Sequence, residues 1–362
     1  MYARAFRRTA GVPTVAGVLV ALLAAGCSAP APSRDSAART GSPGGTPASL
    51  VTGSPGGAPA AAVTGGAIPG AGAPTGRPAR SGCGRPATAG QDRTVEVAVD
   101  PATAEGRRTR TALVHVPAGY RPGQAYPVLL VYHGHGGSSA GAAAETGFSG
   151  LADRSGFLAV YPQGLPDSTG SPMWASAGPV DYGIEELPAT RGLLDTLAAD
   201  YCVDPSRIYA TGTSNGGGMA NYLACRLSDR IAAVAPVVGN MYLPKDGGCR
   251  PARPVSILDV HAVDDPVVAY GGDRGDPSWV LPPVDDWLAG WATLDRCAAR
   301  PAVAVDTPAV RVRRWSGCAP GTAVAAYRVT GGHRWPATLA GNPTAAVIWG
   351  FLAAHRLPAV AR

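Results

Sequence analysis

Charged residues are scarce in this 362-residue sequence, and lysine is almost absent. Only 15% of the residues are charged, and Lys245 is the single lysine. The formal net charge is +6, but three of the positive charges lie in residues 1–27, which contain no acid, so the rest of the chain carries about +3. Such a small surplus does not indicate a nucleic-acid-binding protein.

The hydrophobic run at the N-terminus is too short to cross a membrane. It extends from Val12 to Ala25, about fourteen residues, whereas a transmembrane helix needs about twenty. Three arginines precede it and Gly26-Cys27 follows it, which is the order of an export signal. Leu23–Cys27 resembles a bacterial lipobox, in which the cysteine is acylated and becomes the first mature residue. We therefore expect a lipoprotein signal peptide over residues 1–26 and a lipid on Cys27. Plain secretion with cleavage nearby is the alternative.

Residues 28–80 lack the apolar side chains that a folded core requires. Almost all of them are Ala, Gly, Pro, Ser or Thr, and Thr-Gly-Ser-Pro-Gly-Gly begins at both Thr40 and Thr52. Such a segment cannot offset the entropy lost on ordering. As a flexible coil it would reach roughly 40 Å, which holds a domain clear of a membrane. We expect the lipidated cysteine and a disordered tether over 27–82, and one catalytic domain over 83–362.

Closely spaced cysteine pairs are also missing, because the sequence contains no C-x-x-C. Apart from Cys27, six cysteines remain, and an even number in an exported chain favours disulfides over metal thiolates. Six cysteines allow fifteen connectivities. Proximity in the sequence favours Cys225 with Cys249 and Cys297 with Cys318, which leaves Cys83 with Cys202.

From Thr94 onward, short β-rich runs alternate with helical stretches, which is typical of a mostly parallel sheet covered by helices. The run from Val128 to Tyr132 is apolar throughout, as a strand buried on both faces requires. The expected strands are Thr94–Val99, Thr111–Val116, Val128–Tyr132, Phe157–Tyr161, Arg207–Thr211, Ala232–Val238, Val255–His261 and Ala323–Val329. The expected helices are Ala189–Tyr201, Gly216–Leu227, Val284–Leu294 and Thr344–Ala354. The sequence therefore predicts one α/β domain with a mostly parallel central sheet flanked by helices.

Two serines, Ser139 and Ser214, fit the G-x-S-x-G pattern of serine hydrolases. The pattern alone says little in a chain with 49 glycines. Ser214 directly follows an expected strand and precedes an expected helix, which is the sharp turn that exposes a nucleophile. No strand adjoins Ser139. We therefore expect Ser214 to be the nucleophile, with a buried turn serine as the alternative.

A glycine-rich loop, His133-Gly134-His135-Gly136-Gly137, follows the strand that ends at Tyr132. It resembles the His-Gly loop that supplies an oxyanion-hole amide in serine hydrolases. The expected donors are the backbone N–H groups of His135 and of Asn215, the residue after the nucleophile. His133 is then expected to order the loop. The alternative is a zinc site at His133 and His135, but no Asp-His follows, and we expect neither a metal nor a cofactor.

The acid and the base of a triad should follow the nucleophile in the order acid, then His. Asp264 and Asp265 follow the strand that ends at His261, and His333 lies in a glycine-rich loop before the last helix. His333 is therefore the expected base. Asp265 is the expected acid, because Pro266 favours an extended conformation for the preceding residue and stiffens the loop. Asp264 is the alternative.

These residues together resemble the polyhydroxybutyrate depolymerase and feruloyl esterase family, grouped with carbohydrate esterases of family one. The resemblance covers roughly residues 110–355. It rests on the His133-Gly134 loop, Asp204-Pro205-Ser206-Arg207, Ser214-Asn215-Gly216-Gly217, Ala232–Pro236, the His261–Tyr270 loop, and Gly332-His333 with Trp335-Pro336. It implies an α/β-hydrolase fold and hydrolysis of feruloyl or acetyl esters on polysaccharide, or of 3-hydroxyalkanoate esters, through an acyl-enzyme. The family pattern also puts the acid four residues beyond the strand-end His, which matches Asp265.

Two tryptophans, Trp174 and Trp335, are expected to line the cleft, with plain packing as an equal alternative. A rival hypothesis is a non-catalytic lipoprotein that kept the fold and only binds its ligand. The order of Ser214, Asp265 and His333 argues against that rival. We expect an extracellular enzyme held at the membrane by its lipid, with an ester substrate such as a polysaccharide or polyester as its partner and no nucleic acid.

Overall fold

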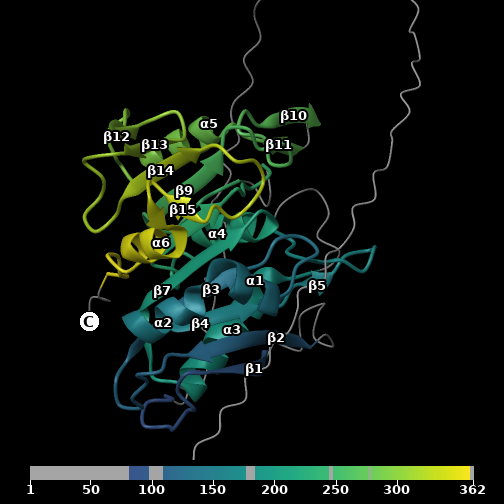
Figure 1. Ribbon diagram of the computed structural model, residues 1–362, viewed down its shortest axis with the longest axis vertical. Coiled ribbons are helices and arrows are strands. Elements are labelled where there is room, and N and C mark those ends of the chain that lie inside the picture. Colours follow the sequence, from purple (N-terminus) through teal and green to yellow (C-terminus); the bar gives the residue numbers. More distant parts are fainter. Residues whose placement is uncertain (1–80, 98–108, 177–183, 244–247, 277–278, 359–362) are drawn as a thin grey trace, which may run out of the picture. The chain divides into compact units, whose positions relative to one another are not determined.

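The computed structural model describes residues 81–97, 109–176, 184–243, 248–276 and 279–358 (Figure 1). They belong to one unit of the chain, Ala73–Arg362. The expected signal peptide, Cys27 and nearly all of the expected tether lie outside the described residues. No helix within the described ranges is long and apolar enough to span a bilayer.

Ten strands of the described chain form one sheet, in the order β1-β2-β4-β3-β7-β8-β9-β14-β13-β12. They are β1 (Gln91–Val97), β2 (Arg110–Val116), β3 (Tyr126–Tyr132), β4 (Leu158–Pro162), β7 (Val203–Thr213), β8 (Ala233–Val237), β9 (Ser256–Ala262), β12 (Ala302–Asp306), β13 (Val310–Arg314) and β14 (Val324–Val329). The six central strands, from β4 to β14, run parallel. The edge strands β1, β2, β13 and β12 are antiparallel to their neighbours. The expected mostly parallel sheet is confirmed.

Helices cover both faces of this sheet (Figure 1). They are α1 (Ser139–Thr146), α2 (Phe148–Ser155), α3 (Glu186–Asp200), α4 (Asn215–Arg226), α5 (Val284–Leu294) and α6 (Thr344–Leu352). Alternate residues of β3 point to opposite faces, so Leu130 belongs to the core cluster that contains residues of α3, α4 and α5, while Leu129 belongs to the cluster that contains residues of α1, α2 and α6. Because both faces are covered, all seven residues of β3 are buried.

Each expected strand and helix overlaps an observed one. The sequence reasoning missed α1, α2 and the β12–β13 hairpin. It also missed three short pairs: β5 (Leu165–Pro166) with β6 (Pro172–Met173), β10 (Asp273–Asp276) with β11 (Trp279–Leu281), and β15 (Thr338–Leu339) with β16 (Asn342–Pro343). The two missed helices have only eight residues each, and glycines in the left-handed conformation end them. That length is too short for a clear helical periodicity.

Three disulfides join the six cysteines of the described domain. They are Cys83–Cys202, Cys225–Cys249 and Cys297–Cys318. This is the pairing that proximity in the sequence favoured. The first bridge closes the longest loop, with a sequence separation of 119, and ties the chain ahead of β1 to the start of β7.

A buried carboxyl on β9 gives the fold a specific dependence on pH. Asp259 is 2% exposed, and burial raises its pKa to about 8. An unfolded aspartate ionises near pH 4, so between about pH 4 and pH 8 the folded chain retains a proton that the unfolded chain releases. The contribution of Asp259 to the free energy of unfolding therefore decreases as the pH rises through this range, and it levels off above pH 8.

Asp259→Asn removes this ionisation, so the variant should become more stable relative to the parent as the pH rises. We expect the difference between variant and parent in the free energy of unfolding, measured with urea, to shift progressively in favour of the variant between about pH 5 and pH 9. Parallel pH profiles for the two proteins would contradict the assignment of this titration to Asp259.

Candidate active site

Ser214 lies in the turn between β7 and α4 and has an unusual backbone conformation. Its φ is 58° and its ψ is −121°, a conformation that costs energy in a residue with a side chain and is concentrated at functional sites. Its N–H donates to the carbonyl oxygen of Val237 at 2.9 Å, which fixes the turn against β8. The serine hydroxyl is consequently held at the carboxyl edge of the sheet.

The glycines on either side of Ser214 allow this turn to pass close to β3. A Cβ on Gly216 would lie 2.2 Å from the carbonyl oxygen of Tyr132, and a Cβ on Gly212 would lie 2.6 Å from the same atom. Both distances are far below van der Waals contact, so a side chain at either position would push β3 and the turn apart. The G-x-S-x-G pattern is thus a packing requirement of this strand-to-helix turn.

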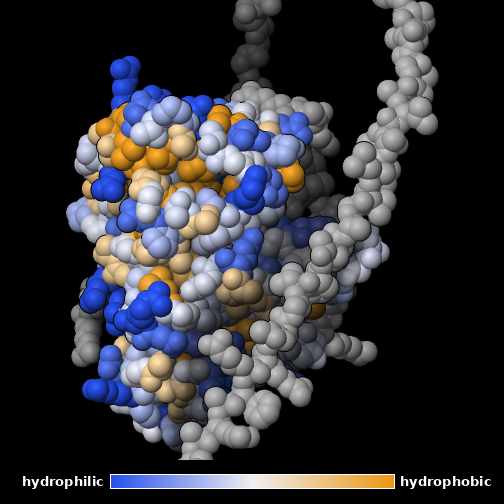
Figure 2. All heavy atoms as spheres, in the orientation of Figure 1, coloured by the Kyte–Doolittle hydropathy of each residue, from blue (hydrophilic) through white to orange (hydrophobic). Residues whose placement is uncertain are grey.

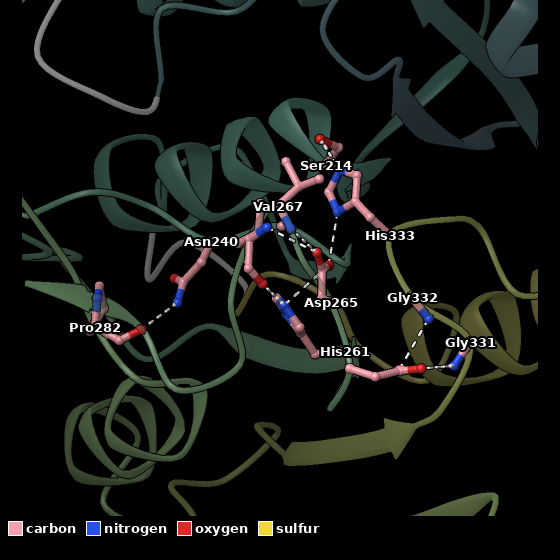
Figure 3. Close-up of polar contacts among 12 residues, drawn as sticks. Ser214, Asn240, His261, Asp265, Val267, Pro282, Gly331, Gly332 and His333 are labelled. Carbon is pink, nitrogen blue, oxygen red and sulfur yellow. Dashed lines mark hydrogen bonds and ion pairs between the residues drawn. The ribbon is translucent and has the colours of Figure 1, made fainter. Parts of the chain in front are cut away.

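The structure brings together Ser214, His333 and Asp265 from three separate loops (Figure 3). Nε2 of His333 lies 2.7 Å from Oγ of Ser214, and Nδ1 lies 2.8 Å from Oδ2 of Asp265. These contacts fit the tautomer that carries its proton on Nδ1, with the serine hydroxyl donating to Nε2. The loops meet because β9 and β14 are parallel neighbours that end at the same edge of the sheet as β7.

The carboxylate of Asp265 is fully engaged. It is 6% exposed, and its Oδ1 accepts hydrogen bonds from the N–H groups of Val267 and Val268 at 2.8 and 2.9 Å. Oδ2 is left to accept from His333. This side chain can therefore fix the orientation of the imidazole without moving itself.

The neighbouring carboxylate, Asp264, points away from the imidazole and holds the loop that carries it. It accepts hydrogen bonds from the N–H groups of Gly331 at 3.0 Å and Gly332 at 3.1 Å. These bonds, led by the one from Gly332, hold the pKa of Asp264 below its usual range. The structure thus brings Asp265, and not Asp264, to His333, while Asp264 links the two loops.

His261, which the sequence placed at the end of a strand and which was not chosen as the base, supports the loop of Asp265. Its buried Nε2 donates to the carbonyl oxygen of Val268 at 2.8 Å and lies 3.7 Å from Oδ2 of Asp265 (Figure 3). Burial lowers the pKa of His261, so the ring is neutral at neutral pH. The four-residue spacing of His261 and Asp265 was the sequence signal from which this contact could have been found.

Two unpaired backbone amides lie beside the serine. The loop of Gly134 adjoins Ser214, because a Cβ on Gly134 would lie 3.5 Å from the serine Cβ. Neither the N–H of His135 nor that of Asn215 donates a hydrogen bond to any described residue. For Asn215 this follows from its position as the first residue of α4. The imidazole of His135 turns away to Asp167, with Nε2 2.8 Å from Oδ2, and leaves its own amide free.

His133 orders the glycine-rich loop through both of its ring nitrogens. Nδ1 lies 2.7 Å from the carbonyl oxygen of Gly134, and Nε2 accepts the N–H of Gly164 at 3.0 Å. Burial lowers the pKa of His133, so the ring is neutral. With both nitrogens engaged, the H-x-H pair does not fit a zinc site. The described residues contain no group of three or more His, Cys, Asp and Glu side chains placed to hold a metal ion.

Trp174 is buried, as the packing alternative expects, and a narrow crevice that Glu186 and Leu193 also line reaches it. Trp174 is 2% exposed, and its indole N–H donates to the carbonyl oxygen of His133 at 2.8 Å. Its backbone N–H donates to Oδ1 of Asn215 at 2.7 Å. Trp174 therefore packs under the glycine-rich loop and holds Asn215. Trp335 is partly buried against Phe148, with ring centroids 5.9 Å apart.

An apolar hollow of about 430 Å³ lies between α6 and strands β13 and β14, where Figure 2 shows hydrophobic surface. Its walls include Leu258, Trp315, Val324, Tyr327, Val347 and Phe351. Neither Ser214 nor Asp265 nor His333 lines this hollow, so the hollow is not part of the candidate active site.

The chain is similar to known esterases. Residues 112–262 match the family model described as "Esterase PHB depolymerase". Feruloyl esterase B of Piromyces equi is 32% identical over 232 residues, which are 62% of this chain and 42% of that protein. Poly(3-hydroxyalkanoate) depolymerase C of Paucimonas lemoignei is 32% identical over 130 residues, which are 35% of this chain and 31% of that protein. The chain thus spans less than half the length of either relative.

The fold also has a counterpart among solved structures. An acetyl xylan esterase from Aspergillus awamori superposes with a TM-score of 0.51 at 16% identity, over 72% of this chain and 99% of that one. At this identity the likeness concerns the fold alone. The family match, the two relatives and the mostly parallel sheet agree: residues 112–262 match the esterase family of polyhydroxybutyrate depolymerases, the relatives include a feruloyl esterase, and the described domain has the α/β-hydrolase fold.

Proposed function

We propose that this protein is a serine esterase that hydrolyses carboxylic esters through Ser214, His333 and Asp265. The observation that carries the proposal is the continuous chain of hydrogen bonds from the serine hydroxyl through the imidazole to a buried carboxylate. A serine is a weak nucleophile unless a base removes its proton, and this arrangement supplies that base.

In the proposed reaction, neutral His333 takes the proton of Ser214 as Oγ attacks the ester carbonyl carbon. His333 then gives that proton to the departing alcohol, and an acyl-enzyme remains. Water, activated by the same imidazole, hydrolyses the acyl-enzyme and restores the serine. Asp265 accepts from Nδ1–H throughout and stabilises the imidazolium.

The negative charge on the former carbonyl oxygen needs donors that are in place before the reaction. We assign this role to the N–H groups of His135 and Asn215, each contributing about 3 kcal/mol to stabilisation of the transition state. Both are unpaired among the described residues, and both belong to segments that contact each other through Trp174. The proposal needs no metal and no cofactor.

The names of the relatives suggest the substrate class: feruloyl or acetyl esters on polysaccharide, or 3-hydroxyalkanoate esters. Two exposed valines next to the acid, Val263 at 38% and Val267 at 63%, fit an apolar substrate part at the rim of the site. Trp335 lies two residues after His333 in the sequence, and we assign it to the same rim.

A panel of small esters tests the function. Methyl ferulate, an acetylated xylan and a 3-hydroxybutyrate oligomer should include at least one substrate that is turned over, and a chelator should not change the rate. Absence of turnover on the whole panel by the folded protein would favour the rival hypothesis of a non-catalytic binding lipoprotein. Loss of activity to the chelator would favour a metal-dependent hydrolase.

We further propose that the enzyme is exported and held at the membrane by a lipid on Cys27. The three disulfides of the described domain fit an oxidising compartment. The N-terminal segment combines a signal-like hydrophobic run with a polar tether that could not itself hold a membrane.

Cys27→Ser should move the protein from the detergent phase to the aqueous phase, or leave the precursor uncleaved, because the acylated thiol is missing. Phase partition and the intact mass of the mature protein measure this. An unmodified Cys27 in the mature wild-type protein would contradict lipid anchoring and would leave plain secretion.

A further inference from the structure

A row of charged and titratable side chains crosses four strands near the carboxyl edge of the sheet. Asp306 of β12 is the register partner of Arg311 of β13, which is the partner of Arg328 of β14, which is the partner of His261 of β9. Register partners share one face of a sheet. Arg311 and Arg328 are therefore direct neighbours of like charge, an arrangement that destabilises a sheet unless an anion compensates it.

The two arginines differ in how their charge is matched. Arg311 donates to both carboxylate oxygens of Asp306. Its Nε lies 3.0 Å from Oδ1, and its Nη2 lies 2.7 Å from Oδ2. The guanidinium of Arg328 lies 5.5 Å from the ring centroid of Tyr270. It donates no hydrogen bond to any residue in the described ranges. One guanidinium of the pair is thus left without an acceptor.

Two carboxylates on this side of the sheet, Asp285 and Asp306, interact electrostatically with Arg328, but each is hydrogen-bonded to another arginine. Asp285 already pairs with Arg313 and with the hydroxyl of Tyr270. Asp259 is protonated at neutral pH, because burial raises its pKa to about 8. His261 is neutral, because burial lowers its pKa. Three arginines, Arg311, Arg313 and Arg328, thus face the two carboxylates of Asp285 and Asp306, which leaves one positive charge in excess.

Arg328 and Arg311 line a hollow of about 240 Å³ beside the proposed catalytic residues. Its walls also include Val263, Thr307, Pro308, Thr330 and Asp306, whose carboxylate is held by Arg311. Val263 lies two residues before Asp265, and Thr330 lies three residues before His333. Ligands of parallel α/β sheets bind at the carboxyl ends of the strands, which is where this hollow opens.

We infer that this hollow is a subsite for a carboxylate of the substrate, carried by a uronic acid unit of an acidic polysaccharide. The planar fork of a guanidinium matches a carboxylate through two parallel hydrogen bonds, Arg328 has no hydrogen-bond acceptor among the described residues, and one positive charge in excess suits a monoanion. The volume is below the range of roughly 300–1,000 Å³ for drug-sized ligands, which fits a single sugar unit. The inference rests on the proposed function, since it adds a selectivity for acidic esters to the same site.

Direct binding tests the subsite without catalysis. Calorimetric titration of the wild-type protein with sodium glucuronate should give measurable binding, and glucose at the same concentration should give none. Arg328→Gln should weaken glucuronate binding at least tenfold, as loss of a charge-assisted pair predicts. Arg314→Gln is the matched control, because Arg314 is an exposed arginine at the end of β13 that lines the other, apolar hollow, and it should bind glucuronate as the wild type does.

Kinetics give the second arm. On acetylated xylan oligomers with a glucuronate branch, Arg328→Gln should lower kcat/KM about tenfold, and on the same oligomers without the branch it should leave kcat/KM unchanged. Arg328→Lys keeps the charge but loses the planar fork, so its kcat/KM on the acidic oligomers should lie between those of the wild type and of Arg328→Gln. This variant replaces Arg328→Gln in the test if the latter does not fold. Equal binding by wild type and Arg328→Gln, or equal losses on both oligomers, would overturn the subsite. Glucuronate binding by a protein that hydrolyses no ester would instead retain the subsite and reject the proposed function.

Discussion

Ser214→Ala should lower ester turnover by about a millionfold, to a residual rate that the backbone amides and substrate binding alone support. The alanine removes the only atom that can form the acyl-enzyme, while the left-handed turn, the glycines around it and His333 remain in place. The measurement is kcat on whichever small ester the wild type turns over, with thermal unfolding to confirm that the variant is folded.

The second G-x-S-x-G serine provides a matched control. Oγ of Ser139 donates to Oε1 of Gln163 at 3.0 Å, and Ser139 begins α1. Ser139→Ala should therefore keep turnover within about twofold of the wild type, since surface changes away from a reacting group rarely alter the chemistry. Comparable losses in both alanine variants would contradict the choice of Ser214.

Asp265→Asn should lower turnover by about a thousandfold or more while the protein stays folded. An amide in place of Oδ2 would no longer accept from Nδ1–H, so His333 would adopt the wrong tautomer or turn away from the serine. The two backbone bonds to Oδ1 can persist with an asparagine, which is why the loop should keep its shape.

Asp264→Asn is the matched comparison on the adjacent residue. The asparagine oxygen can still accept from Gly331 and Gly332, so the loop of His333 keeps its support and the loss should be less than about tenfold. A larger loss in the Asp264 variant than in the Asp265 variant would overturn the assignment of the acid.

Much of the fold could be predicted because it follows from local pattern. The apolar run of β3 requires burial on both faces, and the boundaries of α5, Val284–Leu294, were predicted to the residue. The β12–β13 hairpin was missed although valine and arginine alternate from Val310 to Arg313, because each strand has only five residues and the hairpin is an exposed edge. Helices α1 and α2 were missed because each has only about two helical turns, which is too short for a clear helical periodicity in the sequence.

The site was predictable where one short segment carries the geometry. Ser214 could be chosen over Ser139 because only the former follows a strand, and Pro266 favoured Asp265 over Asp264. The hydrogen bonds by which Asp264 and His261 hold the loops of the site depend on how separate segments meet, which no local pattern reveals. The placement of Arg328 beside Arg311 likewise depends on strand register. For Trp174 the sequence left cleft lining and packing as equal alternatives, because sequence does not report the depth of an aromatic side chain, and the structure buries it.

The most direct test of a nucleophilic Ser214 is its reaction with a fluorophosphonate, followed by mass spectrometry of the digested protein. We expect one covalent adduct, on the peptide that contains Ser214, and none in the Ser214→Ala variant. A folded wild-type protein that forms no adduct, or forms it on another serine, would contradict the account.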